Sequence, residues 1–315
     1  MLKASIFQTI TDKADRKNVV GGIRHDLKQA YEKLIEVKRL TISDNENGKW
    51  LMDYLSDISR IDKESDMFRY PFGNNLKVLF DRQTNISLVA THDNMNKAFS
   101  IIKGIYDTGD ILEREIEAYK PHLIIEGGHY YQQSVVGYKY SQHAFHPYCS
   151  SYKEVGNYLK GVIKTKKKTN LFMPMCYSYR NAVELGLKRL IIEDSHIENS
   201  KALKIVRKKK HSILGLWNSI ADEIKEYANA PEDDTTLTDS QRYIQTFHDC
   251  DQSSDLFRYP CNKNMDAYFL GGKNFDIENV ASCFEELCNF LDGADGMLSA
   301  VQDYEAEMAS YYDYY

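Results

Sequence analysis

Arg242 and His248 are the two residues whose types best suit chemistry on a phosphate ester. Six positions separate them, which on a helix is nearly two turns and about 9 Å of rise. A histidine can take the proton from a ribose 2′-hydroxyl, and an arginine can hold the charge of the transition-state phosphate. At this separation they reach one phosphate only if a second subunit completes the site. The other interpretation is a surface arginine and a helix-capping histidine next to Asp249.

His143, His146 and Cys149 form a second candidate group, because histidine and cysteine are the usual ligands of zinc. Their spacing matches no standard zinc motif, and Pro147 breaks the helix that would align them. We therefore expect residues 127–149 to form a long, ordered aromatic loop, with neither a metal ion nor a cofactor. The glycine pairs of the sequence also lack the remaining positions of the nucleotide-binding motifs.

Two lysine-rich segments have the composition of an RNA-binding surface. The clusters consist of Lys164, Lys166, Lys167 and Lys168, and of Arg207, Lys208, Lys209 and Lys210. The chain carries a net charge of −6, so the whole molecule is not a basic nucleic-acid binder. Each cluster is either a local phosphate-binding patch or the solvated end of a helix.

Arg180, Glu184 and Lys188 follow one another at four-residue spacing within 179–190, where apolar residues recur with a helical period. On a solvent-facing surface such a ladder contributes a few tenths of a kcal/mol per pair. We prefer an interpretation in which Glu184 turns inward and receives Arg258. Removing one partner of such a buried pair typically costs about 3–5 kcal/mol.

The sequence around Arg258 occurs twice. Segments 54–71 and 243–260 align without a gap, 189 residues apart, with eight identities in 18 positions. Each ends in Phe-Arg-Tyr-Pro, where proline ends a helix and biases the residue before it to extended geometry. We interpret both copies as structural latches, with partly buried arginines and with aromatic anchors in the core. The latch residues are Phe68, Arg69 and Tyr70, and Phe257, Arg258 and Tyr259 together with the distant Glu184.

The rest of the chain predicts a mostly α-helical protein made of two related modules. Prolines are few, and most windows show helical apolar spacing, which favours helices. A small β-hairpin is expected after each latch, at 76–89 and at 267–277. The predicted domains are an N-terminal module at 1–112 with a degenerate first helix, a Tyr/His-rich connector at 113–170, and a C-terminal module at 171–315 with an acidic tail.

Apolar spacing also predicts where the helices of the first module lie. We expect helices at 4–14, 17–40 and 94–106, the last with Met95, Ala98, Phe99, Ile102 and Tyr106 facing the core. Two more are expected in the connector, at 111–119 and from the serines at 150–151, which could cap a helix.

The composition is that of a soluble globular protein, with 43% hydrophobic and 27% charged residues. No apolar run approaches the length of a membrane helix, and the N-terminus lacks the apolar stretch of a secretory signal. The six cysteines contain no CxxC pair, which is typical of reduced thiols. We therefore expect a cytoplasmic protein that does not bind a membrane.

The string Tyr-Arg-Asn-Ala-Val-Glu-Leu-Gly-Leu-Lys at 179–188 resembles the opening helix of HEPN-like helical-bundle proteins. In that family Tyr-Arg-x-Ala-x-Glu-x-x-x-Lys is a familiar form. The segment 210–217 and the latch 251–260 also look like uncharacterised bacterial members. The resemblance covers residues 177–292 and, more weakly, 17–107.

The resemblance implies short helical bundles, often dimeric, that serve prokaryotic antiphage defence systems and toxin–antitoxin pairs. Active members are metal-independent ribonucleases whose arginine and histidine lie at the start of a late helix. Here that helix is expected near Asn279 and contains no such motif. We therefore expect a component, itself non-catalytic or weakly catalytic, that binds a protein of the same system or RNA, and a homo-oligomer fits the same pattern. The alternative is a ribonuclease that uses Arg242 and His248.

Overall fold

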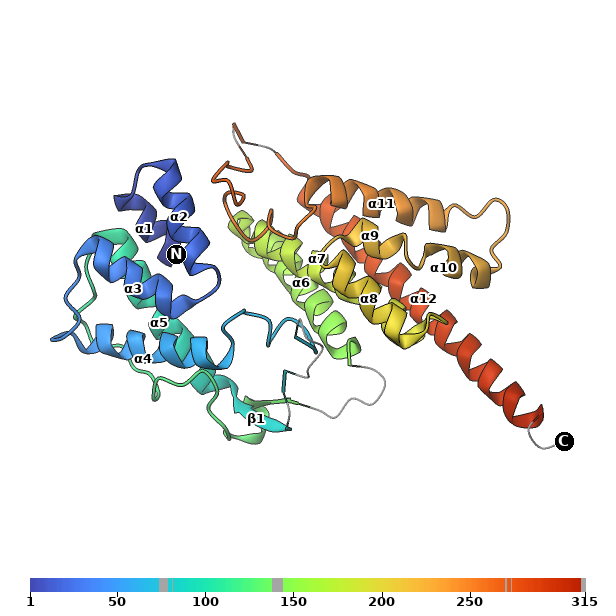
Figure 1. Cartoon of the computed structure of the whole chain (residues 1–315), viewed down its shortest axis with the longest axis horizontal. Helices are drawn as coiled ribbons and strands as arrows, with labels where there is room; N and C mark the ends of the chain where they lie inside the picture. The colour runs from blue at the N-terminus through green and yellow to red at the C-terminus, as the bar shows by residue number, and fades with distance from the viewer. Residues whose placement is uncertain (74–78, 81, 138–143, 270, 273, 313–315) are drawn as a thin grey trace. The chain divides into compact units, whose positions relative to one another are not determined.

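The computed structural model describes residues 1–73, 79–80, 82–137, 144–269, 271–272 and 274–312. The chain is mostly helical, as predicted, and it divides into two compact units (Figure 1). Unit 1 comprises Met1–Lys139 with Lys263–Met265, and unit 2 comprises Tyr140–Asn262 with Asp266–Tyr315. The segment expected as a connector, 113–170, is thus shared between the units. Among the described helices, none combines the length and apolar character needed to cross a membrane.

Unit 1 is built on a core of aliphatic and tyrosine side chains. Its helices are α1 (Leu2–Thr9), α2 (Lys13–Ile23), α3 (Leu27–Lys38), α4 (Glu46–Ile61) and α5 (Leu88–Thr108). The long helix expected at 17–40 is divided in two. Arg24 adopts a positive φ of 48°, and the carboxylate of Asp26 accepts a hydrogen bond from the Gln29 N–H at 3.1 Å. A side chain that caps a new helix competes successfully with continuation of the old one.

The buried face of α5 differs from the expected one. Ala98, Ile101 and Ile105 face the core, whereas Met95, Phe99 and Tyr106 are exposed. The prediction of core positions is therefore confirmed for Ala98 and wrong for Met95, Phe99 and Tyr106, while Ile102 packs half-buried against the core. Two adjacent stripes of this helix are apolar, so periodicity alone could not tell which stripe faces inward.

The helix expected at 111–119 is also wrong, because this segment is not helical. Side chains of α4 and α5 bind its backbone instead. The amide of Asn47 donates to the carbonyls of Leu112 and Arg114 at 2.7 and 2.9 Å, and Asn94 accepts from the Tyr119 N–H at 2.9 Å. These bonds satisfy backbone groups that a helix would have paired internally.

The described strands form one small antiparallel pair in unit 1. β1 (Thr84–Ser87) pairs with β2 (Gln133–Val136), which follows a short turn, η1 (Tyr130–Gln132). The second strand of the hairpin expected at 76–89 therefore pairs with β2, and residues 76–78 of the expected first strand lie outside the described residues. At 267–277 the described part of the chain holds a single bridge between Cys261 and Ala267, not the expected hairpin.

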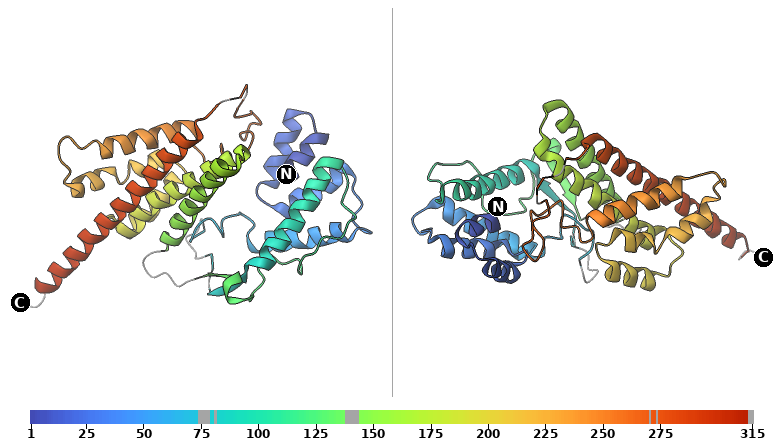
Figure 2. Two further views of the ribbon diagram at one scale, coloured as in Figure 1. Left: turned by 180° about the vertical axis from the view of Figure 1, so that it is seen from behind. Right: turned by 90° about the horizontal axis from the view of Figure 1, so that it is seen from above.

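The other helices of unit 2 pack around its central helix, α7 (Phe172–Arg189). Helix α7 continues into a π-helical turn, η3 (Leu190–Asp194). The other elements are α6 (His146–Lys166), η2 (Thr169–Leu171), α8 (Asn199–Lys209), α9 (Ile213–Trp217), α10 (Ala221–Ala228), α11 (Thr236–Cys250) and α12 (Ile277–Tyr312). The C-terminal end of α12 extends past the other helices of this unit (Figure 2).

Two local features bring α6 close to α7. Helix α6 begins at His146, earlier than the expected serine cap, because proline is well tolerated in the first turn. Gly156 then allows close approach, since a Cβ at this position would lie 2.7 Å from the ring of Tyr179. The Tyr179 hydroxyl donates to Asn157 at 2.5 Å, and its ring stacks on Phe284 of α12.

Candidate functional site

The two latches adopt the same backbone geometry. In the first, the Asp62 carboxylate accepts hydrogen bonds from the N–H groups of Asp66 and Met67 at 2.8 and 3.1 Å. In the second, Asp251 accepts from the equivalent groups of Asp255 and Leu256 at 2.9 and 3.3 Å. Both aspartates end the preceding helix, α4 or α11. Each therefore ties a helix end to the turn that follows it.

Both latch arginines bind within their own turn. Arg69 donates from Nε to the Ser65 carbonyl at 2.5 Å and pairs with Asp66 at 2.7 Å. Arg258 does the same with Ser254 at 2.6 Å and Asp255 at 3.3 Å. The two serines share a positive φ, of 60° and 64°.

The aromatic residues of the latches are less alike. Tyr70 is buried and Phe257 packs half-buried against the core of unit 2. Phe68 and Tyr259 are 42% and 36% exposed, so the prediction that they anchor the core is wrong. Each arginine lies over its own tyrosine ring, at 5.1 and 5.2 Å, which uses the ring as a cation–π partner instead.

A buried network of charges lies behind the second latch. Glu184 is fully buried on α7, and its carboxylate receives Arg180 at 2.5 Å and Lys188 at 2.6 Å. The ring Nδ1 of His211 lies 3.0 Å from the same carboxylate. Arg180 also donates to the His211 carbonyl at 2.5 Å. Because α7 places Arg180 and Lys188 one turn on either side of Glu184, all three charges meet in the core.

Asp251 joins this network to the latch. Its second carboxylate oxygen lies 3.3 Å from Nε of Arg180, an ion-pair distance without hydrogen-bond geometry. The expected pairing of Glu184 with Arg258 is therefore replaced by a connection that runs through Arg180 and Asp251. Arg258 reaches α7 differently, with its guanidinium over the Tyr177 ring at 5.6 Å.

The surroundings of Glu184 keep it ionised. Burial alone would raise its pKa, but Lys188, the hydrogen bond from His211 and the charge of Arg180 together hold the pKa well below its ordinary value. A carboxylate in this state binds its cationic neighbours strongly and has no tendency to donate a proton. The arrangement suits a structural role for the charged motif of α7.

Arg242 and His248 do not meet within one subunit. Both lie on α11, where six residues turn the helix by 600°, so their side chains leave it about 120° apart. Arg242 is 71% exposed and pairs with Asp239. His248 is half-buried, and its Nδ1 has no hydrogen-bond partner among the described residues.

The two basic clusters lie at the ends of different helices of unit 2. Lys166, Lys167 and Lys168 are exposed at the C-terminal end of α6. Arg207, Lys208, half-buried Lys209 and Lys210 end α8. Cations at a helix C-terminus complement the helix dipole, and their exposure leaves these charges accessible to solvent and to phosphates.

The sequence did not reveal a second buried polar group in unit 2. The turn η3 places Asp194 close to Arg189 of α7 and Asp295 of α12, and Ser299 donates to Asp194 at 3.0 Å. Burial, followed by the neighbouring carboxyl of Asp295, raises the pKa of Asp194 to about 8. Asp194 and Asp295 lie 101 residues apart in sequence, so no local motif could have indicated the group.

This raised pKa has a defined consequence for stability. Folded Asp194 keeps a proton that the unfolded carboxyl, with a pKa of 3.8, has released. Unit 2 therefore loses stability as the pH rises from about 4 to about 8, and Asp194 causes no further loss above pH 8.

We expect Asp194→Asn to abolish this loss of stability, which urea unfolding at several pH values would measure. The control Asp292→Asn, at an exposed ion pair, should keep the wild-type slope; an unchanged slope in Asp194→Asn would contradict the assignment.

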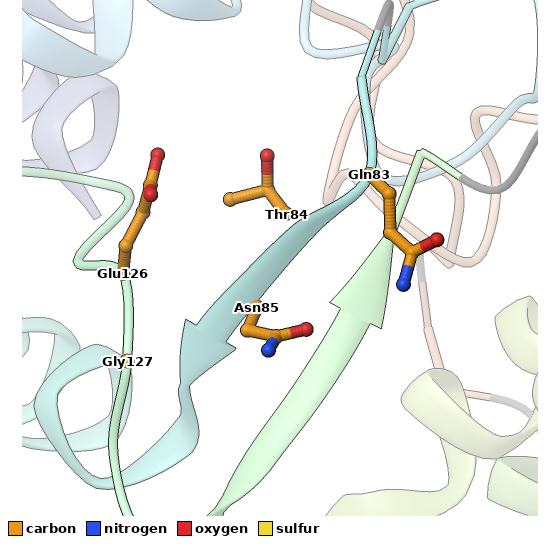
Figure 3. A pocket seen from close by; sticks show the side chains of 5 residues that line it. All are labelled: Gln83, Thr84, Asn85, Glu126 and Gly127. Atoms are coloured by element: carbon orange, nitrogen blue, oxygen red, sulfur yellow. The ribbon is translucent and has the colours of Figure 1, made fainter.

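The described residues offer no candidate metal site. No group of three or more His, Cys, Asp or Glu among them could hold a metal ion, and His143 lies outside the described part. His146 instead contacts Arg189. A small depression beside β1 is lined by Gln83, Thr84, Asn85, Glu126 and Gly127, with the Thr84 side chain on the Glu126 side of the strand (Figure 3). Its one carboxylate is exposed and paired with Arg82.

Comparison of the chain with models of protein families, with curated proteins and with solved structures gave no match.

Two residues of the network around Glu184, Asp251 and His211, were not predicted as its members, because the sequence contains only weak signals for them. Asp251 is identical to Asp62 in the repeat, and His211 follows the second basic cluster directly.

Proposed function

We propose that the chain consists of two related HEPN-like bundles, one in each unit. The element order supports this, because α2, α3, α4, latch and α5 correspond to α8, α9, α11, latch and α12. Helices α2 and α8 both have 11 residues. Both end in the same unusual backbone turn, with φ and ψ of 48° and −112° at Arg24 and of 52° and −105° at Lys210.

The protein acts as a binding component of a prokaryotic antiphage defence system, and it binds a partner protein or RNA with little or no catalysis of its own. The observation that carries this proposal is the network around Glu184. The charged residues of the HEPN-like motif are buried and pair with one another and with the latch. They stabilise a rigid bundle, while the exposed lysine clusters remain for phosphate contacts.

The ribonuclease alternative depends on Arg242 and His248. It is less favoured because α11 directs the two side chains to different sides, and a second subunit would have to complete the site. Incubating wild type and His248→Ala with single-stranded RNA distinguishes the two functions. Cleavage by wild type that is lost in the variant would favour the enzyme and overturn the binding role.

We expect the basic cluster of α6 to contribute to RNA affinity. The triple variant Lys166→Glu, Lys167→Glu, Lys168→Glu should bind single-stranded RNA about tenfold or more weakly at low salt, because three phosphate contacts become repulsive. Each lost phosphate contact lowers the magnitude of the slope of log affinity against log salt by about 0.7, so the three substitutions together should lower it by about 2. Fluorescence anisotropy over a salt series measures both.

A matched control separates a local patch from net charge. Reversing Lys28, Lys33 and Lys49, which lie in surface ion pairs of unit 1, changes the net charge by the same amount. This control should bind RNA as wild type does, apart from a small uniform loss. Equal loss in both variants, or no RNA binding by wild type, would leave the partner protein as the ligand.

A further inference from the structure

His196 lies in the turn between η3 and α8, where its ring contacts two other helices of unit 2. The ring nitrogen Nδ1 lies 2.9 Å from a carboxylate oxygen of Glu223 on α10, and Nε2 lies 2.8 Å from a carboxylate oxygen of Glu305 on α12. The ring also stacks on Tyr227 of α10, with the two centroids 5.0 Å apart. One imidazole therefore joins the turn, α10 and the C-terminal part of α12.

Only a protonated ring satisfies both carboxylates. A neutral imidazole has one N–H group and one lone pair, whereas the imidazolium has two N–H groups. Because both ring nitrogens lie at hydrogen-bond distance from a carboxylate, a neutral ring would turn its lone pair toward a negative charge. The geometry therefore requires the imidazolium. In agreement, the hydrogen bonds to Glu223 and then to Glu305 raise the pKa of His196 above its ordinary value of 6.5.

Loss of the proton breaks the contact with Glu305 and not the contact with Glu223. The Glu223 side chain is 16% exposed and also accepts the backbone N–H of His196 at 2.6 Å, so it stays in place and keeps the Nδ1 proton. The Glu305 side chain is 51% exposed. Water can therefore hydrate its carboxylate once the lone pair of Nε2 repels it.

Glu305 lies where α12 extends past the other helices of unit 2 (Figure 2). One turn earlier, Gln302 donates to the Ser195 carbonyl at 3.1 Å. Among the described residues, Glu305 makes the hydrogen bond to another element that lies nearest the C-terminal end of α12. A short helix end without packed neighbours is marginal in water, so its order depends on the last contact that holds it.

We propose that His196 is a protonation-controlled clasp, which holds the C-terminal turns of α12 on unit 2 while its ring is charged and releases them when the ring is neutral. The sign follows from linkage. A histidine whose pKa is raised by folding contributes stability that is fully present below pH 6.5 and is lost as the pH rises through the folded pKa. The end of α12 is therefore ordered in mild acid and frayed in alkali.

The other titratable groups around the ring do not replace this control. Desolvation, followed by the charges of Glu305 and Glu226, raises the pKa of Tyr227, so its hydroxyl stays neutral while the imidazole titrates. Glu198 caps the first turn of α8. Asp194 has a pKa of about 8 and reaches α12 through a different contact, so a test has to separate it from the clasp.

Glu305→Gln makes that separation, because glutamine can bind the ring in either state. Its amide oxygen accepts from the imidazolium, and its amide N–H donates to the neutral ring. The variant should therefore keep the end of α12 ordered at every pH. Asp194 is unchanged in it, so any effect of that carboxyl appears equally in wild type and variant.

Hydrogen exchange of segment 303–312 in the full chain, followed by mass spectrometry at about pH 6 and about pH 9, measures the order of this end. The ratio of the wild-type rate to the Glu305→Gln rate cancels the chemical effect of pH. It should rise about two- to fivefold between the two pH values, as expected for the loss of one exposed charged contact. The control Glu307→Gln removes the same charge from an exposed side chain two residues further on and should respond to pH as wild type does.

The titration of the ring itself gives a second readout. The NMR signal of its Hε1 proton, assigned by its absence from His196→Gln, should titrate above pH 6.5 in wild type and closer to 6.5 in Glu305→Gln. A wild-type ring that titrates below 6.5 would overturn the proposal. So would a ratio of exchange rates that does not change with pH, since the ring would then titrate without controlling α12.

Discussion

Replacing Glu184 with glutamine should lower the free energy of unfolding of unit 2 by about 3–5 kcal/mol, because two buried cations lose their common partner. Glutamine keeps the size of the side chain and one acceptor, so the loss reports charge and not packing. Arg180 is 1% exposed and Lys188 is 8% exposed, so water cannot replace the carboxylate. This would be one of the largest effects of a near-isosteric change in the chain.

The measurement can be confined to unit 2. The chain has two tryptophans, and Trp217 is fully buried in the core of unit 2 while Trp50 lies on α4 of unit 1. In a Trp50→Phe background, urea unfolding followed by fluorescence therefore reports unit 2. The control Glu285→Gln breaks a partly exposed pair with Lys160 and should cost about 1 kcal/mol or less. Equal costs for the two variants would contradict a structural role for the network.

Glu184 also predicts how unit 2 responds to acid. Its folded pKa lies well below the ordinary value of 4.5, so the unfolded state takes up a proton first as the pH falls. The stability that Glu184 contributes is present above pH 4.5 and is lost as the pH falls from there through the folded pKa. Glu184→Gln should remove this part of the acid slope. A variant that loses stability in acid as steeply as wild type would assign the slope to other groups.

The sequence predicted the helical character of the chain and the four-residue ladder of α7, because both are set by local periodicity. It did not predict the partner of Glu184. Arg180 lies in the same ladder as Glu184, but periodicity does not show whether a charged stripe faces the solvent or the core. The core position of α7 follows from packing by α6, α9 and α12, of which only α6 adjoins α7 in sequence.

The errors in unit 1 have a similar origin. Met95 and Phe99 are as apolar as Ala98 and Ile101, so an exposed apolar stripe and a core face look alike in sequence. The segment 111–119 has helical spacing, yet Asn47 and Asn94 bind its backbone. Long-range side-chain hydrogen bonds of this kind leave no periodic signal.

The two latches provide the second large effect, since they repeat one geometry in different surroundings. Asp251→Ala should destabilise unit 2 by about 3–5 kcal/mol, because it frees two latch N–H groups and also leaves buried Arg180 with one anionic partner fewer. Asp62→Ala removes the same two hydrogen bonds from a half-buried site and should cost unit 1 only about 1–2 kcal/mol. Hydrogen exchange of the latch amides, followed separately in each unit, measures both losses in one molecule.

The variant Asp251→Asn keeps an acceptor for the latch while removing the charge. It should therefore preserve the exchange protection of the turn better than it preserves the stability of the bundle. If Asp62→Ala and Asp251→Ala cost the same, the contact between Arg180 and Asp251 contributes nothing, and the second latch closes its bundle by backbone capping alone.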